Sequence, residues 1–191
     1  KQNVKNIFEI IKIGIKLNSN VKVVMTPSSK EFVTPLTLST VSKNEVFSEF
    51  TTEKNSNPTW NNHVELAEWA DIFIIAPATS NTISSMAHAR CDNLLLACYL
   101  SSTCPVFVAP AMDLEMYKNT LNQKNIKKLI LNNTNVLPVG TGSLASGLDG
   151  EGRMLEPDEI IKYVEKKFKE ILPLNSLNFL ITAGPTHEKI D

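Results

Sequence analysis

Residues 71–82 read DIFIIAPATSNT, and the predicted architecture of the chain is built around them. Residues 72–76 form an unbroken apolar run that is rich in β-branched side chains and ends at Pro77. A short apolar run without polar alternation is typical of a strand buried on both faces, as in a parallel sheet. The sequence therefore predicts an α/β fold, an open parallel sheet flanked by helices, with this strand at its centre.

Small polar residues follow the strand directly: Thr79, Ser80, Asn81 and Thr82. Ligands of parallel α/β sheets bind at the carboxyl ends of the strands. Hydroxyls and free backbone N–H groups at a helix start also suit a phosphate. The same residue types often do no more than cap a helix, and Ser80 or Asn81 would suit that position. The stretch alone leaves the ligand-binding and capping interpretations equally open.

Strand and helix patterns alternate along the rest of the chain. Apolar spacing predicts helices over 3–17, from Thr26 through Leu36, and over 63–70, 92–101, 118–131 and 157–170, with strands over 21–25, 105–109 and near Val136. Residues 43–62 read as a polar loop, and the glycine-rich segment 140–157 reads as a lid or linker. A parallel sheet usually places a strand before its first helix, so we expect an element before Lys1. Residues 178–191 read as a strand and turn that begin a second domain.

Bulk composition narrows the class of protein. The 191 residues are 42% apolar and 20% charged, with a net charge of −1, which argues against a nucleic-acid partner. No apolar run reaches the roughly 18 residues of a membrane span. The three cysteines are odd in number and lack C-x-x-C spacing, so we expect neither a disulfide framework nor a metal site. These features favour a cytoplasmic location.

One histidine has two interpretations. His63 begins the predicted helix 63–70, where a lone histidine is most often a surface or capping residue. Because histidine titrates near neutrality, a role as general acid or base is the functional alternative. The position of His63 in the sequence does not decide between them.

Four motifs in order carry a family resemblance: the His63 block, PATSNT at 77–82, PAMDLEMY at 110–117 and SGLDGEGRMLEP at 146–157. Together they resemble the flavin-dependent cysteine decarboxylases, and within these the phosphopantothenoylcysteine decarboxylases of coenzyme A biosynthesis. The tail 178–191, NFLITAGPTHEKID, resembles the start of the phosphopantothenate–cysteine ligase that is fused behind them in bacteria. The resemblance runs from about Val21 to the end.

The resemblance implies a Rossmann-like flavoprotein that binds FMN at a subunit interface of a homotrimer, or of trimers assembled into a dodecamer. Residues 1–172 would be an amino-terminally truncated decarboxylase domain, and 173–191 a linker and the start of the ligase. The implied substrate is 4′-phosphopantothenoylcysteine and the product 4′-phosphopantetheine. The flavin would oxidise the carbon bearing sulfur, so that a thioaldehyde loses CO2 and the resulting enethiol is reduced again. Mg2+ and CTP are expected only for the ligase.

The resemblance also implies roles for individual residues. His63 would be the active-site histidine beside substrate and flavin. The implied FMN contacts are Thr26, Thr79, Ser80, Asn81, Thr82 and Ala111. The implied substrate contacts are Asp113, Met116, Ala145, Ser146 and Gly147, and Asp113 and Ser146 would also take part in catalysis.

Two of these residues depart from the family pattern. Ser146 stands where many members have a cysteine that protonates the enethiol, and a hydroxyl is a much weaker acid, so it would relay a proton or another donor would act. Asp113 stands where an asparagine commonly holds the substrate carboxylate. An ionised Asp113 would repel that carboxylate and could favour loss of CO2, or Asp113 would be protonated in a dry site.

Two alternatives to the coenzyme A enzyme stay open. A catalytically silent flavoprotein subunit would suit the loss of the cysteine and asparagine, but His63 and the ligase-like tail count against it. A peptidyl-cysteine decarboxylase of peptide-antibiotic maturation is disfavoured by the same tail.

Overall fold

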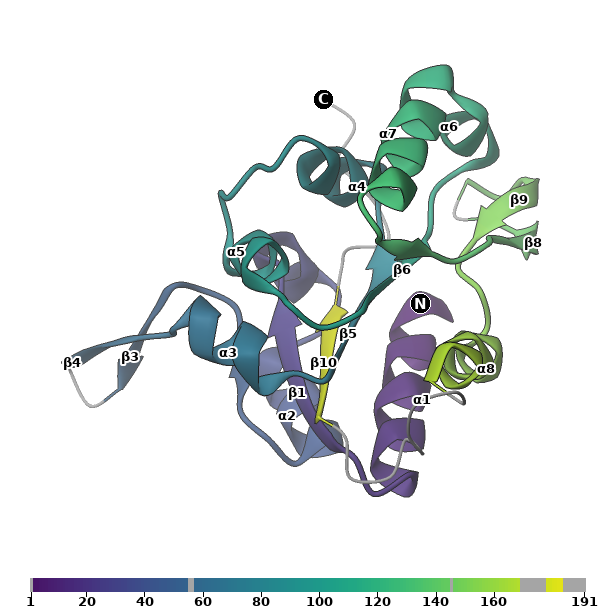
Figure 1. The fold of residues 1–191 in the computed structure, drawn as a ribbon. Coiled ribbons are helices and arrows are strands. Elements are labelled where there is room, and N and C mark those ends of the chain that lie inside the picture. Colours follow the sequence, from purple (N-terminus) through teal and green to yellow (C-terminus); the bar gives the residue numbers. More distant parts are fainter. Residues whose placement is uncertain (1, 55–56, 145, 169–177, 184–191) are drawn as a thin grey trace.

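The computed structural model of this chain describes residues 2–54, 57–144, 146–168 and 178–183 (Figure 1). A six-stranded parallel sheet forms its centre, with the strand order β2-β1-β10-β5-β6-β7. The strands are β1 (Asn20–Met25), β2 (Val46–Phe47), β5 (Ile72–Ala78), β6 (Val106–Pro110), β7 (Asn135–Val136) and β10 (Asn178–Ala183). The predicted open parallel sheet flanked by helices is thereby confirmed.

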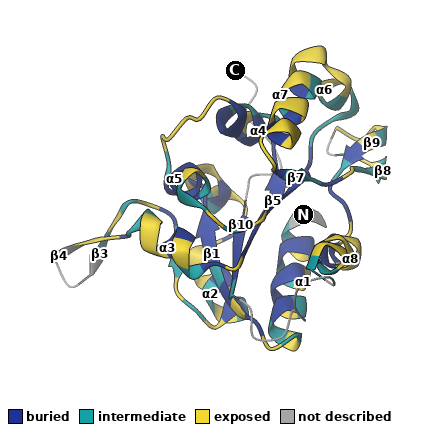
Figure 2. Ribbon diagram, in the orientation of Figure 1, coloured by how far each residue is buried: buried dark blue, intermediate teal, exposed yellow. Residues whose placement is uncertain are grey.

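Helices cover both faces of the sheet. One face packs against α1 (Gln2–Lys16), α2 (Pro35–Ser42) and α8 (Pro157–Phe168). The other face packs against α3 (His63–Trp69), α4 (Ser80–Ala87), α5 (Leu94–Ser101) and α7 (Thr120–Leu131). Successive residues of a strand pack against opposite helix layers. Val23 packs in the cluster with α1, α2 and α8, Val24 packs in the cluster with α3, α4, α5 and α7, and both are fully buried. Figure 2 shows the strands of the sheet as the buried middle layer.

Strand β5 is buried along its whole length, as the apolar run predicts, and it extends two residues further, to Ala78. Its neighbour β6 ends beside it, because Ala78 pairs with Pro110 across a bulge. The backbone N–H of Ala111 also donates to the carbonyl of Ala78 at 2.9 Å. The segments that follow the two strands therefore start from the same edge of the sheet.

Residues 178–183 form a strand, as the pattern of the tail predicts, and this strand lies inside the sheet. Strand β10 pairs in parallel with β1 on one side and with β5 on the other. The fully buried Thr182 accepts a 3.1 Å hydrogen bond through Oγ1 from the N–H of Ala76, next to the bulge in β5. The assignment of 173–191 to a linker and ligase domain stays a prediction, and most of that range lies outside the described residues.

Several predicted boundaries are wrong for local reasons. The helix expected from Thr26 to Leu36 is two elements, the 3-10 helix η1 (Pro27–Glu31) and α2, because Thr34 caps a new helix ahead of Pro35. Residues 43–62, expected as a loop, contain β2 and an antiparallel hairpin of β3 (Thr51–Lys54) and β4 (Asn57–Trp60). The helix expected over 118–131 is preceded by a short α6 (Leu114–Lys118).

The glycine-rich segment is also more ordered than expected. It forms an antiparallel hairpin of β8 (Gly140–Ser143) and β9 (Asp149–Arg153). Glycine supplies the positive φ of 133° at Gly152, and a Cβ there would lie 2.2 Å from the carbonyl oxygen of Met112. The glycines therefore allow a hairpin that packs closely on the loop after β6. In Figure 1 this hairpin and the β3–β4 hairpin lie on opposite sides of the molecule.

Candidate functional site

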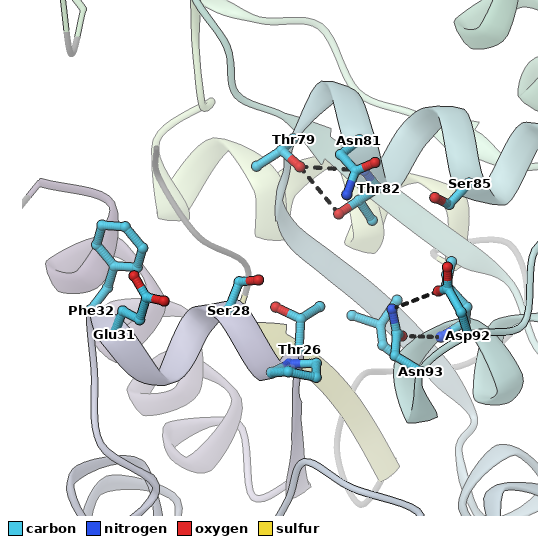
Figure 3. Close-up of a pocket in the computed structure, with 13 residues that line it drawn as sticks. Thr26, Ser28, Glu31, Phe32, Thr79, Asn81, Thr82, Ser85, Asp92 and Asn93 are labelled. Atoms are coloured by element: carbon cyan, nitrogen blue, oxygen red, sulfur yellow. Dashed lines mark hydrogen bonds between the residues drawn. The ribbon is translucent and has the colours of Figure 1, made fainter. Parts of the chain in front are cut away.

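A cavity of about 520 Å³ opens where β1 and β5 end (Figure 3). It is lined by Thr26, Pro27, Ser28, Glu31, Phe32, Thr79, Asn81, Thr82, Ser85, Asp92, Asn93, Leu95 and Leu96. Hydroxyl and amide side chains dominate one part of this lining, whereas Leu95 and Leu96 supply buried apolar surface. The position agrees with the expected ligand site at the carboxyl ends of the strands.

Thr79 connects β5 to α4 and caps that helix. Its Oγ1 accepts a hydrogen bond from the N–H of Thr82 at 3.3 Å and lies 3.2 Å from the Thr82 hydroxyl. The expectation that Ser80 or Asn81 caps α4 is therefore wrong, because Thr79 has the extended backbone that an N-cap needs. Thr79 both caps the helix and, with Thr82, lines the cavity, so the two interpretations are not exclusive.

Thr26 carries an unpaired polar atom at this cavity. The residue is 7% exposed, and its Oγ1 is buried without a hydrogen-bond partner among the described residues. A buried hydroxyl without a partner is costly, so it points to a ligand atom that completes the bond. Thr26 follows β1 directly, where its N–H donates to the carbonyl of Ala183 at 3.4 Å.

Sequence reasoning missed several lining residues. Ser28 and Phe32 belong to the turn after β1, and Asp92 and Asn93 lie just before α5. Asn93 caps α5 by accepting from the N–H of Leu96 at 3.0 Å. The signal was available in the sequence, since Thr26-Pro27-Ser28 and Asp92-Asn93 each place polar residues before a helix.

Two predicted FMN contacts do not line this cavity. The hydroxyl of Ser80 donates to Oδ1 of Asn122 at 2.6 Å, which ties α4 to α7. Ala111 is 9% exposed and belongs to the apolar cluster on the other face of the sheet. Their predicted roles toward FMN stay predictions.

The two residues that depart from the family pattern are in contact. Ser146 donates a hydrogen bond through Oγ to Oδ1 of Asp113 at 2.8 Å. Asp113 is the half-buried N-cap residue of α6, but its side chain makes no capping bond, and Ser146 is exposed at the tip of the β8–β9 hairpin. Asp113 is therefore not enclosed within this chain as the expected dry site would require.

The hairpin is fixed to the loop that carries Asp113. The N–H of Met112 donates to the carbonyl of Gly152 at 2.9 Å. A Cβ at Gly150 would come within 3.0 Å of the Leu114 side chain, which shows how closely β9 approaches α6. Since Met112 and Leu114 flank Asp113, the contact between Asp113 and Ser146 is supported on both sides.

Other predicted substrate contacts lie near this pair. Met116, 37% exposed, lies on α6, and its carbonyl accepts from Nδ2 of Asn122 at 2.7 Å. Gly147 follows Ser146 with a positive φ of 84°, and its N–H donates to the carbonyl of Leu144 at 3.1 Å. Ala145 lies outside the described residues.

His63 lies away from the Asp113–Ser146 pair. It starts α3 beside the β3–β4 hairpin, with its ring edge-on to Phe50 at 6.2 Å between centroids. Asn62 caps α3, so the capping interpretation of His63 is wrong. Its Nδ1 is buried without a partner among the described residues. In Figure 1, α3 and the β8–β9 hairpin lie on opposite sides, so one chain does not bring His63 to Asp113 and Ser146.

Two of the cysteine thiols, one buried and one half-buried, lie away from the cavity lining. Burial raises the pKa of the Cys98 thiol to about 12 and also raises the pKa of Cys104. Over the described ranges, no group of three His, Cys, Asp or Glu side chains could hold a metal ion. A search of the same ranges finds no helix that is long and apolar enough to span a membrane.

Sequence comparisons identify relatives of this chain among known proteins. The Flavoprotein family profile matches residues 3–169. The chain is 48% identical over 164 residues to a cysteine/cysteine sulfinic acid decarboxylase from an unknown prokaryotic organism, covering 83% of this chain and 45% of that protein. It is 41% identical over 179 residues to the coenzyme A biosynthesis bifunctional protein CoaBC of Bacillus subtilis, covering 93% of this chain and 44% of that protein.

Solved structures of related proteins superpose on this chain. A cysteine-to-serine mutant of PPC decarboxylase complexed with pantothenoylaminoethenethiol superposes with a TM-score of 0.67 at 32% identity, covering 85% of this chain and 93% of that one. MrsD from a Bacillus species superposes with a TM-score of 0.69 at 26% identity, covering 87% and 89%. The chain spans less than half the length of these curated sequence relatives. From the profile match and these relatives together, the chain belongs to the Flavoprotein family.

Proposed function

We propose that this chain is the FMN-dependent decarboxylase unit of a longer coenzyme A biosynthesis protein, acting on 4′-phosphopantothenoylcysteine. The observation that carries the proposal is the cavity at the ends of β1 and β5, with the unpaired Thr26 hydroxyl, in a chain of the Flavoprotein family. The CoaBC relatives and the PPC decarboxylase structure support the choice of substrate. Ligase activity with CTP and Mg2+ would belong to the rest of such a protein.

The cavity suits FMN in size and chemistry. Its volume of about 520 Å³ lies within the range of cofactor pockets. The hydroxyls of Thr26 and Ser28 and the amino-terminal end of α4 would hold the phosphate, since helix starts favour anions. Leu95, Leu96 and the half-exposed Phe32 would cover the apolar ring system.

Bound FMN would supply the reversible two-electron oxidation that makes loss of CO2 possible. The chain's own residues would orient the substrate and manage protons. His63 would act as general acid–base, because its buried Nδ1 lacks a partner among the described residues. Ser146 would relay a proton to the substrate carbon that has lost CO2.

The site would be shared between copies in a homotrimer, or in trimers assembled into a dodecamer. Support comes from the separation of His63 and Ser146 in one chain and from Trp60, 58% exposed on the hairpin beside His63. The test mixes inactive His63→Asn protein with inactive Ser146→Ala protein after dissociation and reassembly. Restored turnover is expected, because some interfaces then combine a wild-type His63 with a wild-type Ser146. No recovery in reassembled mixtures would rule out a shared site.

A second candidate reaction is decarboxylation of unacylated cysteine. The relative of 48% identity is named for cysteine and cysteine sulfinic acid. The carboxylate of Asp113, which stands where the family commonly has an asparagine, is the feature of this chain that favours decarboxylation of unacylated cysteine. The three free cysteines and the biosynthetic relatives support a cytoplasmic location for either reaction.

The decisive experiment uses the full-length protein that contains this chain. Its visible spectrum is recorded, and CO2 and 4′-phosphopantetheine are followed by mass spectrometry after addition of 4′-phosphopantothenoylcysteine. A yellow protein that forms both products is expected. A yellow protein without turnover of any cysteine substrate would favour the silent flavoprotein, and a colourless protein that binds no added FMN would refute the flavin site.

A further inference from the structure

We propose that Asn122 is a positioning residue, which holds the turn at the cavity and the helix α6 in a fixed arrangement and so sets how the substrate meets the flavin. This inference rests on the proposed decarboxylase function. It gives a role to a residue of α7 that belongs neither to the cavity lining nor to the contact between Asp113 and Ser146. Asn122 is buried, with 9% of its surface exposed.

The side chain of Asn122 joins two other helices. Its Oδ1 accepts a hydrogen bond from the hydroxyl of Ser80 at 2.6 Å, and its Nδ2 donates to the carbonyl of Met116 at 2.7 Å. Ser80 is the first residue of α4, and Met116 lies in α6. The three helices lie together at one end of the molecule in Figure 1. A single amide of α7 therefore bridges α4 and α6.

The chemistry of the amide fixes the direction of both bonds. A carbonyl oxygen can only accept, so the Met116 end requires the NH2 group of Asn122, and the oxygen of Asn122 then faces Ser80. The hydroxyl of Ser80 is accordingly the donor. Because a buried amide is costly when either end is unpaired, the arrangement of α4 and α6 that satisfies both ends is favoured over any other.

Each end of this bridge lies next to residues of the candidate site. Ser80 stands between Thr79 and Asn81, which both line the cavity. Met116 lies on the short helix α6, for which Asp113 is the N-cap residue, and both are predicted substrate contacts. The bridge therefore connects the flavin side of the proposed site to its substrate side.

A second connection makes this arrangement rigid. At the edge of the sheet, the N–H of Ala111 donates to the carbonyl of Ala78 at 2.9 Å. One hydrogen bond would let the two segments turn about it, but the Asn122 bridge attaches them again further along the chain. Two points of attachment hold Thr79 and Asp113 in one relative orientation. This matters for the rate, because misplacing reacting groups by about 1 Å can cost on the order of a hundredfold.

Gln123 provides a matched control. Its Nε2 donates to the carbonyl of Tyr117 at 2.6 Å, and this bond joins α7 to α6 alone. Gln123→Leu removes a bond of the same kind, between the same two helices, as Asn122→Leu does, but it leaves the connection to Ser80 in place. A difference between the two variants therefore reports the bridge to α4 and not the general attachment of α6.

The test uses the FMN-loaded full-length protein well below its unfolding temperature. The kcat for 4′-phosphopantothenoylcysteine is measured by CO2 release and divided by the amount of bound flavin. We expect this normalised rate to fall about tenfold in Asn122→Leu and in Ser80→Ala, and to stay within about twofold of wild type in Gln123→Leu. The double variant should be no slower than Asn122→Leu, because both changes break one bridge. A residue that only stabilised the fold would lower the unfolding temperature but not the normalised rate.

Ser80→Ala carries the test if Asn122→Leu does not fold, since it removes only a half-buried hydroxyl. An unchanged normalised rate in Ser80→Ala, or an equal fall in Gln123→Leu, would overturn the inference and leave the proposed function standing. Weaker FMN binding in Ser80→Ala with an unchanged normalised rate would assign the hydroxyl to the cofactor and would also overturn the inference. A wild-type protein that binds FMN but releases no CO2 from the substrate would overturn both.

Discussion

The carbonyl of Gly152 accepts a 2.9 Å hydrogen bond from the N–H of Met112, and a Cβ on Gly152 would lie 2.2 Å from the carbonyl oxygen of Met112. This approach joins the β8–β9 hairpin to the loop after β6. It therefore sets where Ser146, at the tip of the hairpin, meets Asp113.

Replacing Gly152 by Ala should detach the hairpin. The new Cβ would collide with backbone, and the φ of 133° disfavours any L side chain, so we expect a loss of roughly 1–3 kcal/mol or more in the free energy of unfolding. Urea denaturation measures it. Gly140→Ala is the matched control, because its Cβ would meet only ordinary contacts at 3.7 Å or more. Equal stabilities of the two variants would contradict the described packing.

Replacing Thr182 by Val should destabilise the sheet. The hydroxyl accepts from the buried N–H of Ala76, and its loss leaves that donor unsatisfied at a cost of about 1–3 kcal/mol. Thr182→Ser retains the acceptor and should cost less. Thermal unfolding of the decarboxylase unit is the measurement. If Thr182→Val left that transition unmoved, residues 178–183 would not form its central strand, and a ligase assignment of the tail would gain support.

Replacing Thr26 by Val should weaken FMN binding without weakening the apoprotein. Valine keeps the shape but removes the unpaired Oγ1, so apoprotein stability should stay the same or rise. We expect the dissociation constant for FMN to rise roughly tenfold, as for one lost hydrogen bond to a charged group. Quenching of FMN fluorescence measures it. The control, Thr40→Val, removes an exposed hydroxyl that bonds to Leu36 and should not alter FMN affinity.

Cys98 should be inert while Cys91 reacts. Burial raises the pKa of Cys98 to about 12, which keeps it a thiol, whereas Cys91 is exposed. Maleimide at pH 8 should label Cys91 in the folded protein and reach Cys98 only after unfolding, as peptide mass spectrometry can check.

The same shift predicts a dependence of stability on pH. Above pH 9 the unfolded thiol of Cys98 loses its proton while the folded one keeps it, so the free energy of unfolding should fall as pH rises from 9 toward 12. Cys98→Ala should show a shallower fall over this range. Identical slopes would contradict the raised pKa.

Local patterns predicted much of this protein. The apolar run at 72–76 indicated a buried parallel strand, and α1, β1 and α8 agree with the predicted segments to within two residues at each end. A strand that is buried on both faces consists almost entirely of apolar residues, and such a run can be recognised in the sequence without knowledge of the rest of the fold. The two hairpins were missed because their strands are short and polar or glycine-rich, and only pairing across the turn stabilises them.

Some residues of the candidate site could be predicted from the sequence, and others could not. The polar turn after β5 was predictable, because the position of a ligand at a strand end follows from the topology of parallel sheets. The polar pair Asp92-Asn93 before a helix was visible in the sequence, but only the tertiary structure shows that it lines the same cavity as the turn after β1.

The fold class, the strand that carries the site and the residue types available to it follow from local polarity and spacing in the sequence. Three relationships are visible only in the folded chain: Ser146 donates to Asp113, His63 lies away from both, and β10 lies between β1 and β5. Each of these relationships joins segments far apart in the chain. Such contacts are selected by shape and by hydrogen-bond satisfaction over the whole core, which no short window of sequence contains.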